Sequence, residues 1–321
     1  MELLQLPRTD LRVSGLCLGT ADFGADTSRD ESLTMLDRFV EVGGVFLDTA
    51  AVYADWTPAG KGSSERVLGE WIATRRPQNM VVATKGAHPE LHAMGVSRFT
   101  RADIAHDIET SLRNLGVETL DLWYLHRDDP GTPVEEVLTM LEEHRRAGHI
   151  RYYACSNWHA NRIAQAQTAA EKMGATGFVA NQPLWSLAQA DLTGSDPTLA
   201  SMTSDMHALH EETQLAAIPY SSQANGFFQK VASGTPVRTI LAQYETDLVR
   251  EENHARYRRL ERLIQETGHS LSQLVLGFLR GQPFPAVPII GPKRVAQLED
   301  SLAGADVKLS AEQIAFLEGS S

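Results

Sequence analysis

The run GGVFLDTAAVY, residues 43–53, decides how the rest of the chain is interpreted. Residues 45–47 predict a buried strand, and that strand ends on Asp48, with Tyr53 shortly after it. A carboxylate at the end of an apolar strand is unfavourable unless a charged or hydrogen-bonding group meets it. The partner of Asp48 is therefore expected at the end of a neighbouring strand.

Short apolar runs of this kind recur along the chain, and a helical pattern follows each of them. The expected strands are residues 13–19, 44–48, 80–85, 120–126, 150–157, 177–182, 214–221 and 285–291. Regular alternation of strand and helix predicts a parallel sheet with right-handed crossover connections. Two α/β architectures are built in this way, the doubly wound sheet and the closed barrel.

The glycine pattern separates the two architectures. A doubly wound sheet that binds dinucleotides carries G-x-G-x-x-G after a strand, whereas Gly60-Lys61-Gly62 is followed by Glu65 where a glycine is required. Eight strand–helix units instead predict one (β/α)₈ TIM barrel domain over residues 1–321. Residues 1–15 predict a β-hairpin that plugs the bottom of the barrel, and residues 234–254 a long loop among extra C-terminal loops and helices.

Composition excludes several classes of partner. The chain has 29 basic and 41 acidic residues, a net charge of −12, so neither nucleic acid nor an anionic membrane is expected to bind it. Cys17 and Cys155 each lie in an apolar run and are expected to be buried free thiols. The N-terminus lacks a signal-peptide pattern, and no run of about 18 apolar residues occurs, so a cytoplasmic protein is expected.

Active residues of a barrel gather at the carboxyl ends of its strands. Three of the expected strands end in side chains whose chemistry is complementary. The second strand ends at Asp48 with Tyr53 beyond it, the third at Lys85 and the fourth at His126. An ammonium near a phenol lowers the phenol's pKa, so Lys85 is expected to meet Asp48 and to activate Tyr53 as a proton donor. Any one of these residues would more often be structural, but four matched groups together indicate an active site.

These segments resemble the aldo-keto reductase family. FLDTAAVY, ATKG and YLHRDD are similar to its three catalytic segments, and the resemblance extends from the N-terminal hairpin to about Leu317. It implies a catalytic tetrad of Asp48, Tyr53, Lys85 and His126. It also implies hydride transfer from NADPH to an aldehyde or ketone, with Tyr53 as the general acid and NADH as the less favoured cofactor.

The resemblance further implies a cofactor site on the later strands. Cofactor contacts are expected from Gly19, Thr20, Ser156, Asn157, Gln182, Tyr220, Ser221, Ser222, Gly226, Ile290, Gly291, Lys293, Arg294 and Gln297. Among these, Ser156, Asn157 and Gln182 are expected to hold the nicotinamide carboxamide, and Tyr220 to stack on the nicotinamide ring.

The end of the last strand is expected to bind the phosphate of NADP. Lys293 and Arg294 precede a predicted helix, whose exposed N–H groups favour an anion. Ser222 and Gln223 stand where the family commonly has proline and leucine, so the loop over the pyrophosphate is expected to close differently.

Aromatic and charged residues suggest the class of substrate. Phe23, Trp56 and Trp158 are expected to line the substrate pocket, where the tryptophans would stack on a sugar ring. The run Arg127-Asp128-Asp129 after His126 is expected to meet hydroxyl groups, which favours a sugar-derived carbonyl. Alternatively, the two aspartates only anchor a loop.

Two hypotheses from other classes stay open. Some proteins that resemble the family are nucleotide-loaded regulatory subunits of channels with weak turnover. A metal-dependent barrel hydrolase would use His88 and His92, but Pro89 and Gly95 argue against the helix that such ligands need, and no metal is expected.

Overall fold

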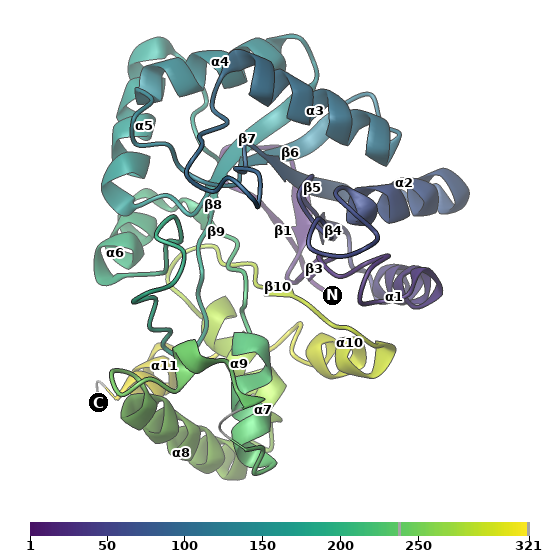
Figure 1. The fold of residues 1–321 in the computed structure, drawn as a ribbon. Coiled ribbons are helices and arrows are strands. Elements are labelled where there is room, and N and C mark those ends of the chain that lie inside the picture. The colour runs from purple at the N-terminus through teal and green to yellow at the C-terminus, as the bar shows by residue number, and fades with distance from the viewer. Residues whose placement is uncertain (237–238, 320–321) are drawn as a thin grey trace.

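The protein folds into a barrel of eight parallel strands (Figure 1). The computed structural model describes residues 1–236 and 239–319. In sheet order the strands are β10 (Ile289–Ile290), β3 (Cys17–Gly19), β4 (Phe46–Asp48), β5 (Val81–Gly86), β6 (Leu120–Leu125), β7 (Ile150–Ser156), β8 (Ala180–Gln182) and β9 (Ala216–Ala217). The Val287 N–H donates to the Ala217 carbonyl at 2.9 Å, and the Ile289 N–H donates to Pro219 at 3.0 Å, which joins the last strand to the seventh. The predicted (β/α)₈ barrel is confirmed.

An N-terminal hairpin precedes the barrel, as the sequence predicted. Strands β1 (Leu3–Gln5) and β2 (Arg12–Ser14) pair in antiparallel fashion. Leu6, Leu11 and Val13 are buried and belong to the same apolar cluster as the side chains inside the barrel. The hairpin therefore packs into the barrel interior.

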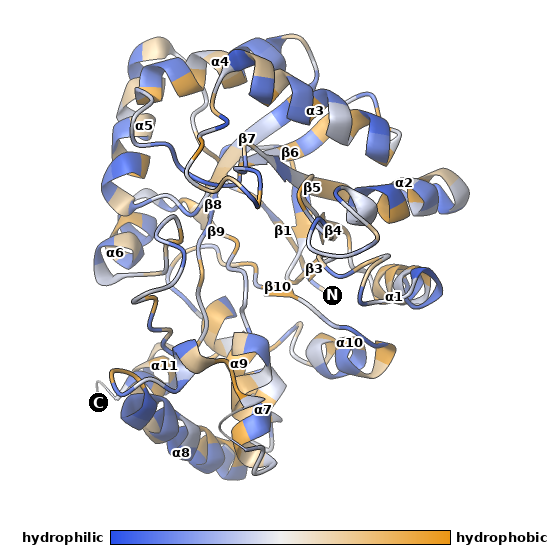
Figure 2. Ribbon diagram, viewed as in Figure 1, coloured by the Kyte–Doolittle hydropathy of each residue, from blue (hydrophilic) through white to orange (hydrophobic). Residues whose placement is uncertain are grey.

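Amphipathic helices surround the barrel, and Figure 2 shows hydrophobic and hydrophilic residues interspersed along them. The helices between successive strands are α1 (Arg29–Glu41), α2 (Ser63–Arg75), α3 (Arg101–Leu115), α4 (Val134–Arg146), α5 (Ala160–Met173), α6 (Ser204–Thr213) and α9 (Leu271–Arg280). Extra elements precede α9 or follow β10, namely η1 (Ala224–Gly226), α7 (Phe227–Ala232), η3 (Ala242–Tyr244), α8 (Arg250–Thr267), α10 (Val295–Leu302) and α11 (Ala311–Glu318). Among the described residues, no helix is long and apolar enough to cross a membrane.

The prediction of one long loop over residues 234–254 is wrong in part. The 3-10 helix η3 lies inside it, and α8 begins at Arg250. The first turn of α8 carries Glu251 and Glu252, so its sequence lacked the apolar period that signals a helix. Residues 237–238 of this segment lie outside the described residues.

A close contact between α2 and α3 places polar groups behind the strand ends. A Cβ atom at Gly69 would lie 2.2 Å from the Asn114 carbonyl oxygen, so only glycine allows the helices this approach. The Asn114 side chain donates to the buried Glu65 carboxylate at 2.9 Å. The Thr84 hydroxyl also donates to the Glu65 carboxylate, at 2.7 Å. The helix contact thus supports the strand residue next to Lys85.

Candidate active site

Strand register brings the predicted catalytic residues together at the carboxyl end of the barrel. Asp48 ends β4 and is opposite Ala83 of β5, so Lys85 lies two residues further towards the same end. His126 follows directly after β6, and its N–H donates to the Gly86 carbonyl at 2.9 Å. The acid, the amine and the imidazole thus come from three consecutive strands.

The loop after β4 carries Tyr53 to the same place. The Ala51 N–H donates to the Lys85 carbonyl at 3.0 Å, which ties this loop to the strand that holds the amine. Ala54 has a left-handed backbone (φ 69°), and the Gly62 N–H donates to the Tyr53 carbonyl at 3.2 Å. The phenol is thereby held over the end of β5.

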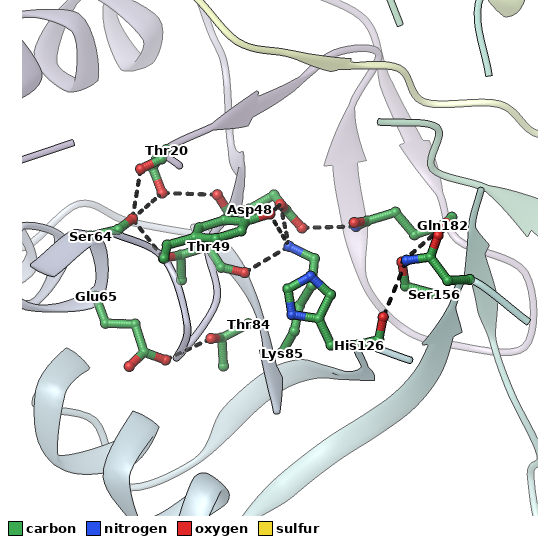
Figure 3. Close-up of polar contacts among 12 residues, drawn as sticks. Thr20, Asp48, Thr49, Ser64, Glu65, Thr84, Lys85, His126, Ser156 and Gln182 are labelled. Carbon is green, nitrogen blue, oxygen red and sulfur yellow. Dashed lines mark hydrogen bonds and ion pairs between the residues drawn. The ribbon is translucent and has the colours of Figure 1, made fainter. Parts of the chain in front are cut away.

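Lys85 is the centre of the arrangement. Its ammonium donates to Asp48 Oδ1 at 2.6 Å, to the Thr49 carbonyl at 2.8 Å and to the Tyr53 hydroxyl oxygen at 2.8 Å. The Lys85 side chain is 0% exposed and that of Asp48 is 2% exposed. Three acceptors satisfy all three N–H bonds of the ammonium, and the predicted pairing of Asp48 with Lys85 is observed (Figure 3).

Burial and charge act in opposite directions on these groups. Burial favours the neutral amine, but the carboxylate of Asp48 and then Tyr53 outweigh it and raise the pKa of Lys85. Burial also raises the pKa of the Tyr53 phenol, and the nearby Lys85 ammonium only partly offsets this. The predicted net lowering of the Tyr53 pKa is therefore wrong, because desolvation of the phenolate outweighs the attraction of one cation.

His126 is a neutral imidazole in this site. Burial, aided by the positive charge of Arg127, lowers the pKa of His126 well below its usual value. Its Nδ1 atom is buried and has no hydrogen-bond partner among the described residues. The ring lies edge to face against His88, with the ring centres 4.8 Å apart, and against Tyr53 at 5.9 Å. His126 therefore has hydrogen-bonding capacity that the described residues leave unused.

Sequence reasoning missed the contact of His88 with His126, although His88 follows β5 on the same segment as Lys85. Its ring is buried, and Nδ1 lies 2.6 Å from the Pro89 carbonyl. Its place just after the strand that carries Lys85 was the available signal, but it was considered only as a metal ligand. Among the described residues, no group of three or more histidine, cysteine or acidic side chains is placed to bind a metal ion.

A set of hydroxyl groups beneath the ion pair was also missed. Ser64 Oγ lies 2.7 Å from the hydroxyls of both Thr20 and Thr49, and Thr20 donates to the Asp48 carbonyl at 2.9 Å. Thr20 was predicted to contact the cofactor, but its buried hydroxyl instead binds the main chain of Asp48. Serine and threonine are too common for such a set to be recognised from the sequence.

The residues predicted to hold a carboxamide lie beside the ion pair. Ser156 Oγ donates to the Gln182 carbonyl at 2.8 Å, and the Gln182 amide donates to Asp48 Oδ2 at 2.9 Å. Asn157 donates to the His126 carbonyl at 3.2 Å and accepts from the Tyr220 hydroxyl at 2.8 Å. The structure thus brings these residues next to the predicted tetrad, and Figure 3 shows Ser156 and Gln182 beside Asp48, Lys85 and His126.

The loop after β9 is anchored by the two residues that depart from the family pattern. The buried Ser222 hydroxyl donates to the Ile289 carbonyl, and Gln223 accepts from Ser301 at 3.1 Å. Ser221 and Gly226 flank this region with left-handed backbones (φ 52° and 75°). Ser222 therefore supports the closing strand through a buried hydroxyl, and its side chain is not exposed to a ligand.

The predicted phosphate-binding residues lie at the start of α10 and differ from each other. The Lys293 ammonium lies 3.2 Å from Asp22 and 3.5 Å from Asp26, whereas no ion pair within the described residues involves Arg294. The Lys293 N–H also donates to Gln297 Oε1 at 2.8 Å. Gly291 is exposed and Ile290 is buried in the core.

Two of the three predicted pocket residues are not available to a ligand. Phe23 is 1% exposed and Trp158 is 0% exposed, and the Trp158 ring packs edge to face against Phe178 with ring centres 5.0 Å apart. Their assignment to a pocket was wrong, because both lie in the hydrophobic core. Trp56 is 53% exposed, and its ring centre lies 6.3 Å from that of Tyr53.

The charged run after His126 anchors loops. Asp128 pairs with Arg162 at 3.1 Å, and Asp129 accepts from Ser97 at 2.6 Å. Arg127 donates to the His126 carbonyl at 3.0 Å and to the Thr198 hydroxyl at 2.9 Å. The two aspartates predicted to meet substrate hydroxyls are thus already engaged, as the alternative interpretation proposed.

Known proteins resemble this chain over nearly its whole length. The family described as "Aldo/keto reductase family" matches residues 15–321. The chain is 29% identical to the uncharacterized oxidoreductase YrpG of Bacillus subtilis (strain 168), over 99% of this chain and 95% of the relative. It is also 29% identical to an aryl-alcohol dehydrogenase (NADP(+)) of Phanerodontia chrysosporium, over 97% and 83%. The crystal structure of the thermostable aldo-keto reductase Tm1743 with the inhibitor epalrestat has a TM-score of 0.72 and 23% identity over 100% of both chains.

The central ion pair yields a prediction about stability. Lys85→Met leaves the Asp48 carboxylate buried without its cation, and the free energy of unfolding measured in urea should fall by about 3–5 kcal/mol. Lys308→Met is the matched control, because Lys308 pairs with Glu2 at the surface and should contribute only about 0–1 kcal/mol. Equal losses in the two variants would contradict a structural role for the buried pair.

Proposed function

Since the chain belongs to the aldo/keto reductase family, we propose that it reduces an aldehyde or ketone to an alcohol, with NADPH as hydride donor and Tyr53 as general acid. Members of the family are oxidoreductases that reduce carbonyl groups with a nicotinamide cofactor. The observation that supports the role of Tyr53 is the contact of 2.8 Å between its hydroxyl oxygen and the Lys85 ammonium.

Tyr53 is suited to deliver a proton at neutral pH. Burial keeps the pKa of its phenol above the usual value, so the group is protonated when a carbonyl binds. As the proton leaves, negative charge develops on an oxygen that already lies beside a fixed cation, which stabilises the transition state. Asp48 holds that cation in place through its bond of 2.6 Å.

His126 is suited to orient the substrate. A neutral imidazole carries one N–H, which can donate to a carbonyl oxygen near the Tyr53 hydroxyl. Because burial lowers the pKa of His126 well below its usual value, the ring stays neutral over the physiological pH range. We assign proton transfer to Tyr53 and orientation of the carbonyl to His126.

The donors and acceptors beside the tetrad fit a nicotinamide cofactor. When bound, this cofactor supplies a hydride to the carbonyl carbon. The Gln182 amide oxygen and the Ser156 hydroxyl oxygen can accept from the N–H groups of a carboxamide, whereas Asn157 is engaged with His126 and Tyr220 and supports the site. Tyr220 is half-buried, and its hydroxyl is held by Asn157 at 2.8 Å, which fixes the plane of a ring on which a nicotinamide can stack.

Arg294 is the stronger candidate for the phosphate of NADPH. Its charge is not engaged within the described residues, whereas Lys293 lies between two carboxylates. A guanidinium also binds a phosphate through paired N–H groups. We therefore propose that NADPH is preferred over NADH mainly through Arg294, with a smaller contribution from Lys293.

An aromatic carbonyl is the better supported substrate class. The aspartates expected to bind sugar hydroxyls are engaged with Arg162 and Ser97, and Trp158 is buried. The exposed Trp56 ring beside Tyr53 offers a surface on which an aromatic ring can stack. The relative named aryl-alcohol dehydrogenase, 29% identical, also supports an aryl carbonyl.

Removal of the Tyr53 hydroxyl tests the proposed mechanism. Tyr53→Phe keeps the ring and removes only the proton, so kcat for carbonyl reduction should fall by about 10²–10⁴-fold while NADPH still binds. The measurements are NADPH oxidation with benzaldehyde and NADPH binding by fluorescence. Near-normal turnover in the variant would exclude Tyr53 as the acid. Absence of turnover in the unaltered protein, despite NADPH binding, would favour a nucleotide-loaded regulatory subunit.

Single substitutions test the assignment of the phosphate site. Arg294→Ala should raise the Kd for NADPH by about tenfold to a hundredfold, because a charge-assisted bond to the phosphate is lost, and should leave the Kd for NADH nearly unchanged. Lys293→Ala should have a smaller effect, because its charge is shared with Asp22 and Asp26. Equal damage to both cofactors would mean that these residues contact a part that NADPH and NADH share.

Competing substrates test the proposed class. We expect kcat/KM for an aromatic aldehyde to exceed that for a keto sugar, and Trp56→Ala to reduce only the aromatic value. Loss of one aromatic stacking contact corresponds to about 0.5–1.5 kcal/mol, or a reduction of roughly twofold to tenfold. Preference for the keto sugar in the unaltered protein would restore the hydroxylated class.

A further inference from the structure

We propose that Gln182 is a positioning residue for the catalytic ion pair, because its amide holds the second carboxylate oxygen of Asp48. The kinetic consequences of this inference rest on the proposed reductase function. The contact itself does not, and it can be tested without cofactor.

The two oxygens of Asp48 have different partners. Oδ1 accepts from Lys85 at 2.6 Å and lies 3.5 Å from the Tyr53 hydroxyl, whereas Oδ2 accepts from the Gln182 amide at 2.9 Å. Among the described residues, Gln182 is the sole hydrogen-bond donor to Oδ2. Without it, one oxygen of a carboxylate that is 2% exposed would lack a partner, which is unfavourable for a buried charge.

Hydrogen-bond chemistry determines which end of the Gln182 side-chain amide faces Asp48. An ionised carboxylate only accepts hydrogen bonds, so the NH₂ end of the amide must face Asp48. The amide oxygen is then the end that remains for another donor, such as the carboxamide N–H of a cofactor. Ser156 fixes the main chain of Gln182 through its bond of 2.8 Å to the carbonyl. Gln182 thus connects the expected cofactor site to Asp48.

The bond also spans the barrel. Asp48 ends β4 and Gln182 ends β8, and these strands are separated by β5, β6 and β7 in the sheet. Figure 3 shows Gln182 and Lys85 both reaching the Asp48 carboxylate, each from its own strand. A carboxylate held from two sides resists rotation about its side-chain torsion. The Lys85 ammonium, and with it the Tyr53 hydroxyl 2.8 Å away, therefore keeps one position.

A double-mutant cycle in urea tests the contact on the cofactor-free protein. The variants are Gln182→Met, Asp48→Leu and the two combined. If the bond exists, the shifts in unfolding free energy should not add, because the second substitution removes a partner already lost. Additive shifts would overturn the proposal. If Asp48→Leu does not fold, the next comparison decides.

A second comparison replaces only Gln182. Gln182→Glu keeps the shape but places a carboxylate against Asp48, whose charge should raise the pKa of the introduced group above the value of about 4.3 in the unfolded chain. The introduced carboxylate destabilises the fold when it is ionised. The loss of unfolding free energy relative to the unaltered protein should therefore be small below about pH 5 and should grow towards pH 8. Gln182→Met has no titrating group and should show no such trend relative to the unaltered protein. If the unfolding free energies of the two variants change with pH in parallel, the proposal is overturned.

Kinetics separate positioning of Asp48 from mere binding of the cofactor. At saturating NADPH and pH 8, Gln182→Met should lower kcat by about tenfold to a hundredfold, and Gln182→Glu by more. Ser156→Ala is the comparison variant, because Ser156 does not contact Asp48, and it should raise the KM for NADPH more than it lowers kcat. If Gln182→Glu is the more active of the two Gln182 variants, Gln182 acts through the cofactor alone. If the unaltered protein shows no turnover, the proposed function fails and the urea experiments still judge the contact.

Discussion

The buried ion pair between Lys85 and Asp48 is the constraint on which the rest of the site depends. A charge inside a protein is tolerated only when its partner and its remaining hydrogen bonds are in place, and here every N–H of the ammonium has an acceptor. Those acceptors come from the end of β4 and the loop beyond it. The barrel must therefore hold two neighbouring strands in register and close the Tyr53 loop over them for the pair to exist at all.

This requirement explains which parts of the site could be predicted from sequence. Asp48, Lys85 and His126 each follow an apolar run, and the ends of consecutive parallel strands converge, so their proximity follows from pattern and topology. The sign of the Tyr53 pKa shift could not be predicted in this way. It depends on how strongly the phenol is desolvated, and burial of a loop residue is decided by tertiary packing.

Tertiary packing also explains the other predictions that were wrong. Trp158 follows a strand end closely, so the sequence placed it near the active residues, but its side chain turns away and packs against Phe178. Asp128 was placed correctly near the site, yet Arg162 of the next helix neutralises it. For α8, a highly polar helix offered too little apolar periodicity to be recognised. For Trp158 and Asp128, the sequence does not show in which direction the side chain points or which distant residue it contacts.

The position of Lys293 between Asp22 and Asp26 makes the availability of its charge depend on ionic strength. All three side chains are at least partly exposed, so dissolved salt screens their attraction over about one Debye length, roughly 8 Å under physiological conditions. The chain as a whole carries a net charge of −12, which opposes the approach of any phosphorylated ligand at low salt. Under the proposed role of Lys293, the preference for NADPH would therefore be adjustable from positions 22 and 26, where a neutral residue would release the Lys293 ammonium.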